Sequence, residues 1–269
     1  MNTAVADDVD DALLTTSRTF YLPIRQLPPG LCEAVSSAYL CLRAIDEIED
    51  HPGLPTVDKA RALRAVAQAF QAAVTPAAID TALQPYEGVL PEVTRQLSRW
   101  AYYSPSSVAA RIWEATAVMA SRMAEWAERD WRIATPDDLD QYTFAVAGSV
   151  GLLLSDLWSW FNGTDTDRTA AVEYGRTLQA VNIRKDLHVD ANRGVTFLPA
   201  GWTADDLDIY IDQKMIHADR YLKSLPAGPI RVFSAIPYEL ARATAVALRN
   251  GKDKLGRHEV EAIVARCTA

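Results

Sequence analysis

The chain has 269 residues, of which 49% are hydrophobic and 23% are charged. It is therefore long and apolar enough to bury a substantial core, which excludes a wholly disordered protein. Its 27 Lys and Arg against 35 Asp and Glu give a formal net charge of −8, which argues against broad electrostatic binding to nucleic acid or anionic membranes. The three cysteines are few and odd in number, which favours a reducing, cytoplasmic compartment over a disulfide framework.

Neither end of the chain carries a pattern for export or membrane insertion. The first residues, MNTAVADDVDD, are acidic and lack the basic and apolar regions of a signal peptide. The longest apolar stretch, Phe144 to Leu154, falls well short of the roughly 20 residues that cross a bilayer. We therefore expect no export and no transmembrane anchor, and we expect this stretch to form a buried helix.

Helical spacing of Ala, Leu, Arg and Glu runs through almost the whole chain, and alternating strand patterns hardly occur. Breaks that combine Pro, Gly or a capping Ser, Thr or Asp predict about nine helices in an all-α fold. No linker is rich enough in Gly, Ser or charge to mark a second domain. The breaks are LPPG (27–30), HPGLP (51–55), TPAA (75–78), SPSS (104–107), TPDD (135–138), FNGTDTD (161–167), FLPAGW (197–202) and LPAGP (225–229).

The helix predicted over AYLCLRAIDEIEDH carries an acidic stripe. Tyr39, Arg43, Asp46 and Asp50 stand at offsets of 0, 4, 7 and 11 residues, so they share one helical face, with Glu49 beside them. Apolar residues between them place part of this helix against a core, where a carboxylate needs a compensating cation.

Two glycines interrupt the apolar helix further along the chain. Gly148 and Gly151 each weaken a helix by about 1 kcal/mol relative to Ala. They indicate either close helix packing or room for a ligand chain, and the residues alone do not decide between the two.

A second acidic stripe repeats this geometry in LQAVNIRKDLHVD. Gln179, Asn182, Asp186 and Asp190 stand at offsets of 0, 3, 7 and 11 residues. If the two helices face each other, five or six hard oxygen ligands converge, which suits Mg²⁺ bridged to a phosphate-bearing substrate better than Zn²⁺. The alternative is that both stripes are solvated helix faces.

Basic residues accompany each stripe. Arg43 lies within the first, and Arg184, Lys185 and Arg193 surround the second. Guanidinium and ammonium groups at these positions could bind the phosphate oxygens that a metal leaves uncovered. The charge pattern therefore predicts a diphosphate site.

These residues resemble the squalene/phytoene synthase family, whose members are all-α enzymes that use prenyl diphosphates and carry two aspartate-rich motifs on opposed helices. The resemblance implies an isoprenoid synthase helical bundle, with a single domain over residues 1–269 around a central apolar cavity. The matching segments, which span Ser17 to Ala243, are SRTFYLPIRQLPPG, YLCLRAIDEIED, QYTFAVAGSVG, QAVNIRKDLHVDANRGVTFLP and VFSAIPYELARA.

The resemblance also implies roles for individual residues. Tyr142 matches the tyrosine that steers ionisation and proton transfer, and it would act with Asp46 and Asp186 in catalysis. Two or three Mg²⁺ ions bridged by diphosphate would be held by Asp46, Glu49, Asp50, Asn182, Asp186 and Asp190. The diphosphate contacts would be Ser17, Arg18, Thr19, Tyr39, Arg43, Lys185 and Arg193. The pocket walls would include Phe20, Trp126, Ala147, Gly148, Gly151, Gln179, Phe233 and Ile236.

Two departures from the family pattern bear on the substrate. Lys185 stands where the family usually has Arg, so a point charge replaces a bidentate fork. The segment SRMAEWAERDW lacks the usual Gly-Met pair and places Glu125, Trp126 and Trp131 near the expected prenyl pocket. A pocket wall rich in Trp favours a flat aromatic guest, because aromatic rings stack.

We therefore expect a Mg²⁺-dependent prenyltransferase of isoprenoid or secondary metabolism that ionises an allylic prenyl diphosphate and transfers the prenyl group to a small, carbazole-like aromatic acceptor. The alternative is head-to-head condensation of two prenyl diphosphates, as in squalene and phytoene synthases. A helical Mg²⁺-binding interaction protein is a third interpretation. The prenyl chain length, the use of NADPH and the oligomeric state stay open.

Overall fold

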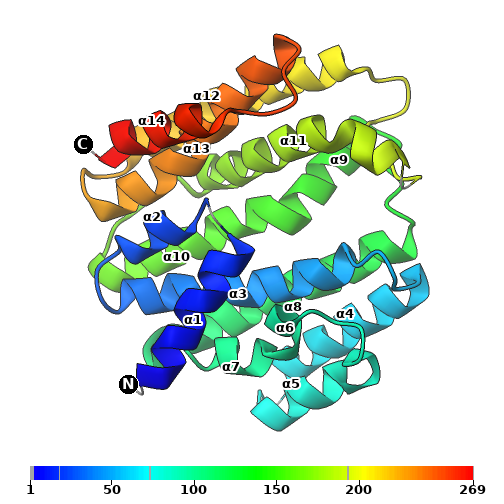
Figure 1. The fold of residues 1–269 in the computed structure, drawn as a ribbon, viewed down its shortest axis with the longest axis vertical. Helices are drawn as coiled ribbons and strands as arrows, with labels where there is room; N and C mark the ends of the chain where they lie inside the picture. The colour runs from blue at the N-terminus through cyan, green and yellow to red at the C-terminus, as the bar shows by residue number, and fades with distance from the viewer. Residues whose placement is uncertain (1–2, 18, 73, 193, 269) are drawn as a thin grey trace. The chain divides into compact units, whose positions relative to one another are not determined.

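The computed structural model describes residues 3–17, 19–72, 74–192 and 194–268, and these form helices and connecting segments without any strand (Figure 1). The expected all-α class is confirmed. The chain divides into two compact units, residues 1–130 and 131–269. A single domain over the whole chain stays a prediction.

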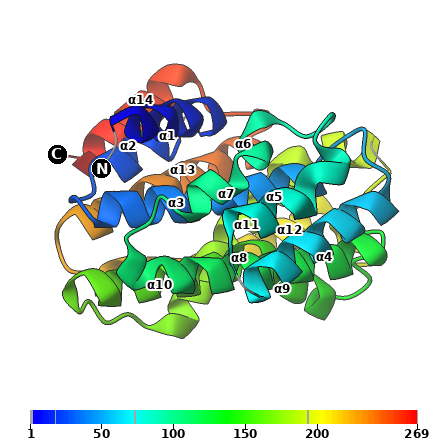
Figure 2. The same ribbon diagram turned by 90° about the horizontal axis from the view of Figure 1, so that it is seen from below.

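Unit 1 is built around α3, which contacts α8, α7, α6 and α4. The most extensive pairing is between α4 and α8, which run side by side (Figures 1 and 2). Its helices are α1 (Thr3–Thr16), α2 (Tyr21–Arg25), α3 (Leu31–Glu49), α4 (Thr56–Gln71), α5 (Pro76–Leu83), the 3₁₀ turn η1 (Gln84–Tyr86), α6 (Glu92–Arg95), α7 (Leu97–Ala101) and α8 (Ser106–Glu128).

Buried side-chain hydrogen bonds hold α3 in place. Ser37 Oγ donates to the carbonyl of Trp100, at 2.7 Å, and Thr94 Oγ1 donates to the carbonyl of Ala44, at 2.9 Å. Trp100 is itself fully buried, with its indole N–H donating to Val93 O at 2.8 Å. Because these bonds join α3 to α6 and α7, they fix the helix that carries the first acidic stripe.

Unit 2 is built around α11, which contacts α12, α10, α13, α9 and the segment η2. Capping boxes start two of its helices: Thr135 with Asp138 before α9, and Thr203 with Asp206 before α12. Its elements are α9 (Pro136–Thr143), the π-helical segment η2 (Phe144–Gly148), α10 (Ser149–Asn162), α11 (Arg168–Asn192), α12 (Ala204–Ser224), α13 (Pro229–Arg249) and α14 (Arg257–Thr268).

The glycines of unit 2 allow two helical backbones to touch. A Cβ on Gly151 would lie 2.0 Å from the carbonyl oxygen of Ala171, and one on Gly175 would lie 2.2 Å from that of Ala147. Neither position accepts a side chain without a shift of the backbone. Gly151 therefore serves close helix packing in the structure, because the backbone of α11 occupies the place where its side chain would lie.

The apolar stretch from Phe144 to Leu154 is part of a longer helix. Residues Pro136–Asn162 run on through α9, η2 and α10 as a helix of 27 residues, within which an 18-residue window has a mean hydropathy of 1.4, so this helix is long and apolar enough to cross a membrane by length and composition alone. The stretch itself was expected to be too short. It packs against α11 through Gly151 and Gly175, and the absence of a membrane anchor stays a prediction.

The number of helices differs from the expected nine. The described residues contain fourteen α-helices, because short helices such as α2, α6 and α7 lie in segments for which the Pro, Gly and capping residues predict no break. At Gln96, for example, a backbone angle pair of φ −96° and ψ 17° separates α6 from α7 without any Pro or Gly.

Candidate active site

The first acidic stripe lies on one face of α3 in unit 1. Arg43 forms ion pairs with both Asp46 and Glu47, and the Arg43 and Asp46 side chains are 31% and 33% exposed. Burial, followed by repulsion from Asp50, raises the pKa of Asp46 to about 7, although Arg43 acts in the opposite direction. Asp46 thus shares Arg43 with Glu47, and its negative charge is not fully compensated. A carboxylate in this state is suited to bind a metal ion.

The α1–α2 junction adds hydroxyl groups beside this stripe. The hydroxyl of Tyr39 donates to the carbonyl of Thr16 at 3.3 Å, and the buried Ser17 Oγ accepts the backbone N–H of Phe20 at 2.9 Å. The rings of Phe20 and Tyr39 are 5.7 Å apart. Burial also raises the pKa of Tyr39, which keeps its phenol a hydrogen-bond donor. Unit 1 therefore brings Ser17, Phe20 and Tyr39 together next to Arg43, with the exposed Thr19 at the same junction.

Glu49 and Lys59 meet at the carboxyl end of α3. Glu49 is only 5% exposed, and the buried ammonium of Lys59, on α4, donates to the Glu49 carbonyl oxygen at 2.6 Å. This places a cation at the carboxyl end of the helix that carries Asp46, Glu49 and Asp50. The sequence offers only a weak sign of it, a single lysine on an otherwise apolar helix face.

The second stripe lies on α11 in unit 2. Asn182 is exposed, Asp186 and Asp190 are half-buried, and the ammonium of Lys185 lies 3.1 Å from Asp186 Oδ2. Lys185 thus stands at the carboxylate that the family pattern pairs with Arg. Two predicted diphosphate contacts, Arg18 and Arg193, lie outside the described residues.

Arg184 does not serve the second stripe. It lies about half a turn around α11 from Asn182 and Asp186, and its Nε donates to Asp208 Oδ1 on α12 at 3.2 Å. Arg249 lies 3.7 Å from the same carboxylate. The expectation that Arg184 binds phosphate is therefore wrong, because this guanidinium is used to join α11 to α12.

Tyr142 occupies the last turn of α9, two residues before the π-helical segment. It is 5% exposed, and its ring stacks on Phe197 with the centroids 4.7 Å apart and the planes at 20°. Phe197 lies in the segment that follows α11, and Ala200 in the same segment donates its N–H to Ala134 O at 3.1 Å. This segment therefore covers one face of Tyr142. Gln179 and Ala147, predicted for the pocket, are both half-buried.

Two of the three predicted pocket aromatics, Trp126 and Phe233, are core residues within their own units, whereas Phe20 is half-buried. Phe233 packs edge-on against Trp158 at 5.6 Å, and Ile236 on the same helix is fully buried. Trp126 is 4% exposed, and the guanidinium of Arg129 covers its ring at 4.2 Å. A surface hollow of about 640 Å³ between α4 and α8 contains none of the predicted pocket residues.

Glu125, which was expected near the prenyl pocket, lies at the surface of unit 1. Its side chain is 59% exposed and lies 3.8 Å from Arg64 on α4. Successive residues of a helix point about 100° apart, so Trp126 turns into the core while Glu125 turns to the surface.

The carboxylate and amide oxygens of the two stripes are donors that fit Mg²⁺, but the coordination shell of the ion needs further oxygen ligands. Among the residues that the structure describes, no three His, Cys, Asp or Glu side chains converge closely enough to hold a metal ion. Carboxylate and amide oxygens, the donors of both stripes, are the ligands that Mg²⁺ takes, and it commonly completes its shell with substrate phosphates and water.

An all-α fold with one aspartate-rich helix face in each unit defines a class of candidate diphosphate-binding proteins. The chain matches the profile of the squalene/phytoene synthase family over residues 13–210. It belongs to the squalene/phytoene synthase family.

Squalene synthases are among its similar relatives. The chain is 28% identical over 270 residues to the squalene synthase of Schizosaccharomyces pombe, covering 88% of this chain and 58% of that protein. It is 33% identical over 255 residues to squalene synthase 1 of Panax ginseng, covering 85% of this chain and 60% of that protein. The chain thus spans a little under two thirds of the length of these relatives.

Solved structures share the fold. The complex of TcSQS with the ligand BPH1237 aligns with a TM-score of 0.83 at 24% identity, covering 98% of this chain and 86% of that chain. A dehydrosqualene synthase in complex with a ligand aligns with a TM-score of 0.67 at 18% identity, covering 99% of this chain and 96% of that chain.

Proposed function

We propose that this chain is a Mg²⁺-dependent prenyltransferase of isoprenoid biosynthesis that ionises an allylic prenyl diphosphate. The observation that carries the proposal is the stripe on α3, where Asp46 is half-buried, is repelled by Asp50 and shares the cation Arg43 with Glu47. Such a stripe is costly for a merely structural helix, and it is the arrangement that a divalent cation relieves.

Each stripe has its own part in the proposed chemistry. Bound Mg²⁺ would neutralise the diphosphate and stabilise the charge that develops as it leaves. Arg43 and Lys185 supply fixed positive charge toward phosphate oxygens, and hydroxyls of the α1–α2 junction and Tyr39 donate hydrogen bonds. The residues proposed to hold the metal are Asp46, Glu49 and Asp50 on α3 and its carboxyl end, and Asn182, Asp186 and Asp190 on α11.

Tyr142 is proposed to hold or move a proton. Its phenol belongs to a buried ring fixed by Phe197, so the oxygen has a defined direction instead of a mobile one. Apolar walls exclude water from the allylic cation, which would otherwise be quenched to an alcohol.

The acceptor proposed first is a second prenyl diphosphate, joined head to head. This choice is supported by family membership, by relatives that are squalene synthases, and by a fold shared with a dehydrosqualene synthase. It replaces the aromatic acceptor as the leading candidate. Glu125 at the surface and Arg129 over the ring of Trp126 also weaken the argument for a special aromatic pocket there.

An aromatic, carbazole-like acceptor is the second candidate. It is favoured by Trp126 and Trp131, which are both buried in a segment where the family pattern differs from this sequence. Buried indoles offer flat surfaces for stacking on a ring.

Mass spectrometry of products tests both candidates. The protein is incubated with Mg²⁺ and geranyl, farnesyl or geranylgeranyl diphosphate, each with and without carbazole. A condensed hydrocarbon formed from one prenyl diphosphate alone is the expected result, and it should disappear in the double variant Asp46→Asn/Asp186→Asn. A prenylated carbazole without any hydrocarbon would move the second candidate to first place. Absence of both products and of diphosphate release would refute the proposed function.

A further inference from the structure

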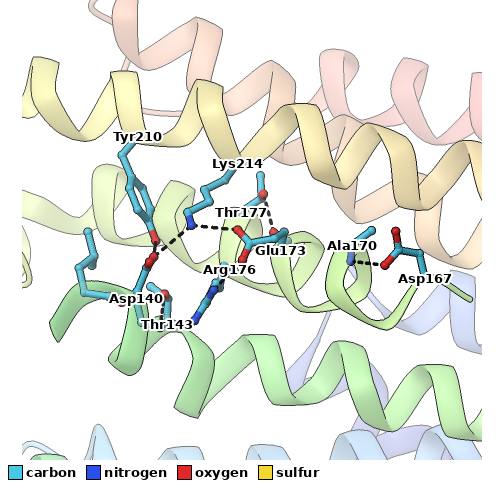
Figure 3. A network of polar contacts seen from close by, with 10 residues as sticks. Asp140, Thr143, Asp167, Ala170, Glu173, Arg176, Thr177, Tyr210 and Lys214 are labelled. Atoms are coloured by element: carbon cyan, nitrogen blue, oxygen red, sulfur yellow. Dashed lines mark hydrogen bonds and ion pairs between the residues drawn. The ribbon is translucent and has the colours of Figure 1, made fainter. Parts of the chain in front are cut away.

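A polar network in unit 2 is made by residues that belong to neither acidic stripe. It joins Asp140 on α9 to Glu173 and Arg176 on α11 and to Tyr210 and Lys214 on α12 (Figure 3). The aspartate-rich pattern of α11 does not include these residues, and their partners are far apart in the sequence.

Lys214 is the centre of the network. Its ammonium lies 3.1 Å from Asp140 Oδ1 and 2.9 Å from Glu173 Oε2. Arg176 contacts the other oxygen of Glu173 at 2.6 Å, and the Tyr210 hydroxyl donates to Asp140 Oδ1 at 2.6 Å. The Lys214 and Glu173 side chains are only 16% and 12% exposed. Two cations thus balance two carboxylates in a poorly solvated place, and removing one would leave an uncompensated charge.

The ionisation states agree with this geometry. Burial alone would raise the pKa of Asp140, but hydrogen bonds from Tyr210 and Lys214 and the charges of Lys214 and Arg176 hold it below its usual value. Burial and the bond to Asp140 raise the pKa of Tyr210, so its phenol remains a donor.

The network fixes the end of α9 at both its side chain and its main chain. Besides the two bonds to the Asp140 carboxylate, Arg176 donates to the Asp140 carbonyl oxygen at 3.1 Å (Figure 3). Thr143 Oγ1 donates to the carbonyl of Leu139 at 2.7 Å. Tyr142 stands between these points, and the π-helical segment begins at Phe144. A π-helical turn is a rare and localised departure from the α-helix, so contacts from neighbouring helices matter for keeping it.

A buried ion network is weak evidence for stability, because desolvation offsets most of the attraction between its charges. Such a network does favour one arrangement of α9, α11 and α12, since any other arrangement of these helices leaves buried charges unpaired. The residue best placed to benefit is Tyr142, which lies two residues after Asp140 on the same short helix and whose ring stacks on Phe197.

We propose that Lys214, through Asp140 and Glu173, is a positioning residue for Tyr142. It sets the rotation of the last turn of α9 and keeps the π-helical segment, so that the Tyr142 hydroxyl points in one direction. The inference rests on the proposed function in assigning proton transfer to Tyr142, while the structural effect of Lys214 can be measured without any substrate.

Hydrogen exchange tests the structural half in the intact protein. In Lys214→Met, we expect the amides of residues 140–148 to exchange at least about tenfold faster, while amides of α8 in unit 1 keep their rates. The matched control is Lys223→Met on the same helix, where Lys223 is 72% exposed and paired with Asp219, and it should change neither region. Unchanged protection of residues 140–148 in folded Lys214→Met would overturn the proposal.

A kinetic cycle tests the link to Tyr142. Lys214→Met should lower kcat by about tenfold or more with the KM for prenyl diphosphate nearly unchanged, and Lys214→Arg should restore most of it. In a Tyr142→Phe background, Lys214→Met should cause no further loss. Equal losses in both backgrounds would show a general structural effect and overturn the positioning role.

A milder variant covers the case in which Lys214→Met does not fold. Tyr210→Phe removes one hydrogen bond to Asp140 and no charge, so it should give smaller changes of the same two kinds, and no change in either would overturn the proposal. If the wild-type protein makes no product from any prenyl diphosphate, the proposed function fails. The exchange rates of residues 140–148 then still decide whether Lys214 holds this segment.

Discussion

Replacing Gly175 by Ala should destabilise unit 2, although Ala is the better helix former. Gly175 lies within α11, and a Cβ there would be 2.2 Å from the carbonyl oxygen and 2.7 Å from the carbonyl carbon of Ala147. An ordinary contact needs 3.4 Å or more, so α11 and the π-helical segment would have to separate by roughly 1.2 Å. The obstructing atoms are backbone, so no side chain can rotate out of the way.

The two opposing terms give the size of the effect. Helix propensity favours Ala over Gly by about 1 kcal/mol, whereas overpacking against a fixed backbone costs about 3 kcal/mol, at the upper end of its usual range. The net loss in the free energy of unfolding is then about 2 kcal/mol. For a chain of this size it corresponds to a fall in Tm of about 4–8 °C.

Thermal unfolding followed by circular dichroism at 222 nm measures this loss. Gly148→Ala is the matched control, because its Cβ would meet two side chains that can shift, Phe144 at 3.1 Å and Val172 at 3.2 Å, and its one backbone neighbour, the Val172 carbonyl oxygen, is 3.3 Å away, where a small shift of a few tenths of an ångström suffices. We expect the control to lose clearly less than Gly175→Ala. A Tm for Gly175→Ala at or above that of the wild type would refute the reasoning, and equal losses in both variants would show that backbone contact is not the cause.

Four further outcomes are expected. Chelation of divalent ions should abolish turnover, and added Mg²⁺ should restore it while Zn²⁺ does not; turnover that survives excess chelator would contradict the metal assignment. Asp46→Asn and Asp186→Asn should each suppress diphosphate release with circular dichroism unchanged, and a variant with wild-type turnover at saturating Mg²⁺ would remove that residue from the ligand set. Trp126→Phe should keep the fold and, if an aromatic acceptor is used, should lower prenylation of the ring more than hydrolysis of the diphosphate; equal reductions would argue against stacking on Trp126. Arg64 lowers the pKa of Glu128 through a hydrogen bond, so the contribution of this pair to the free energy of unfolding is present above the ordinary carboxyl pKa and is lost as the pH falls through the lowered pKa. Arg64→Met should therefore reduce the free energy of unfolding by about 0.5 kcal/mol at pH 7 and should leave it unchanged near pH 2. A reduction that persists in acid would point to lost packing instead.

Local chemistry determined where the long helices begin and end. The predicted break at residues 135–138 is the capping box of Thr135, the break at 161–167 separates α10 from α11, and the break at 225–229 separates α12 from α13. Caps, Pro and Gly act within a few residues of themselves, so a sequence displays them directly. The grouping of Tyr39, Arg43 and Asp46 on one face also follows from the helical period alone.

Only the tertiary structure decided which partners several of these side chains contact. Arg184 and Lys185 are neighbours in a basic pair, yet Arg184 binds Asp208 on α12 and Lys185 stands at Asp186. The choice between packing and pocket at Gly151 was likewise open until α11 was placed against it.

The network around Lys214 is the clearest case of what a single sequence does not display. Its partner Asp140 lies 74 residues earlier in the chain, and no spacing rule connects the two positions. A helical period reports only which residues of one helix share a face. The energy of a buried charge depends on what the facing helix presents, and that is set by packing between segments that are distant in the sequence.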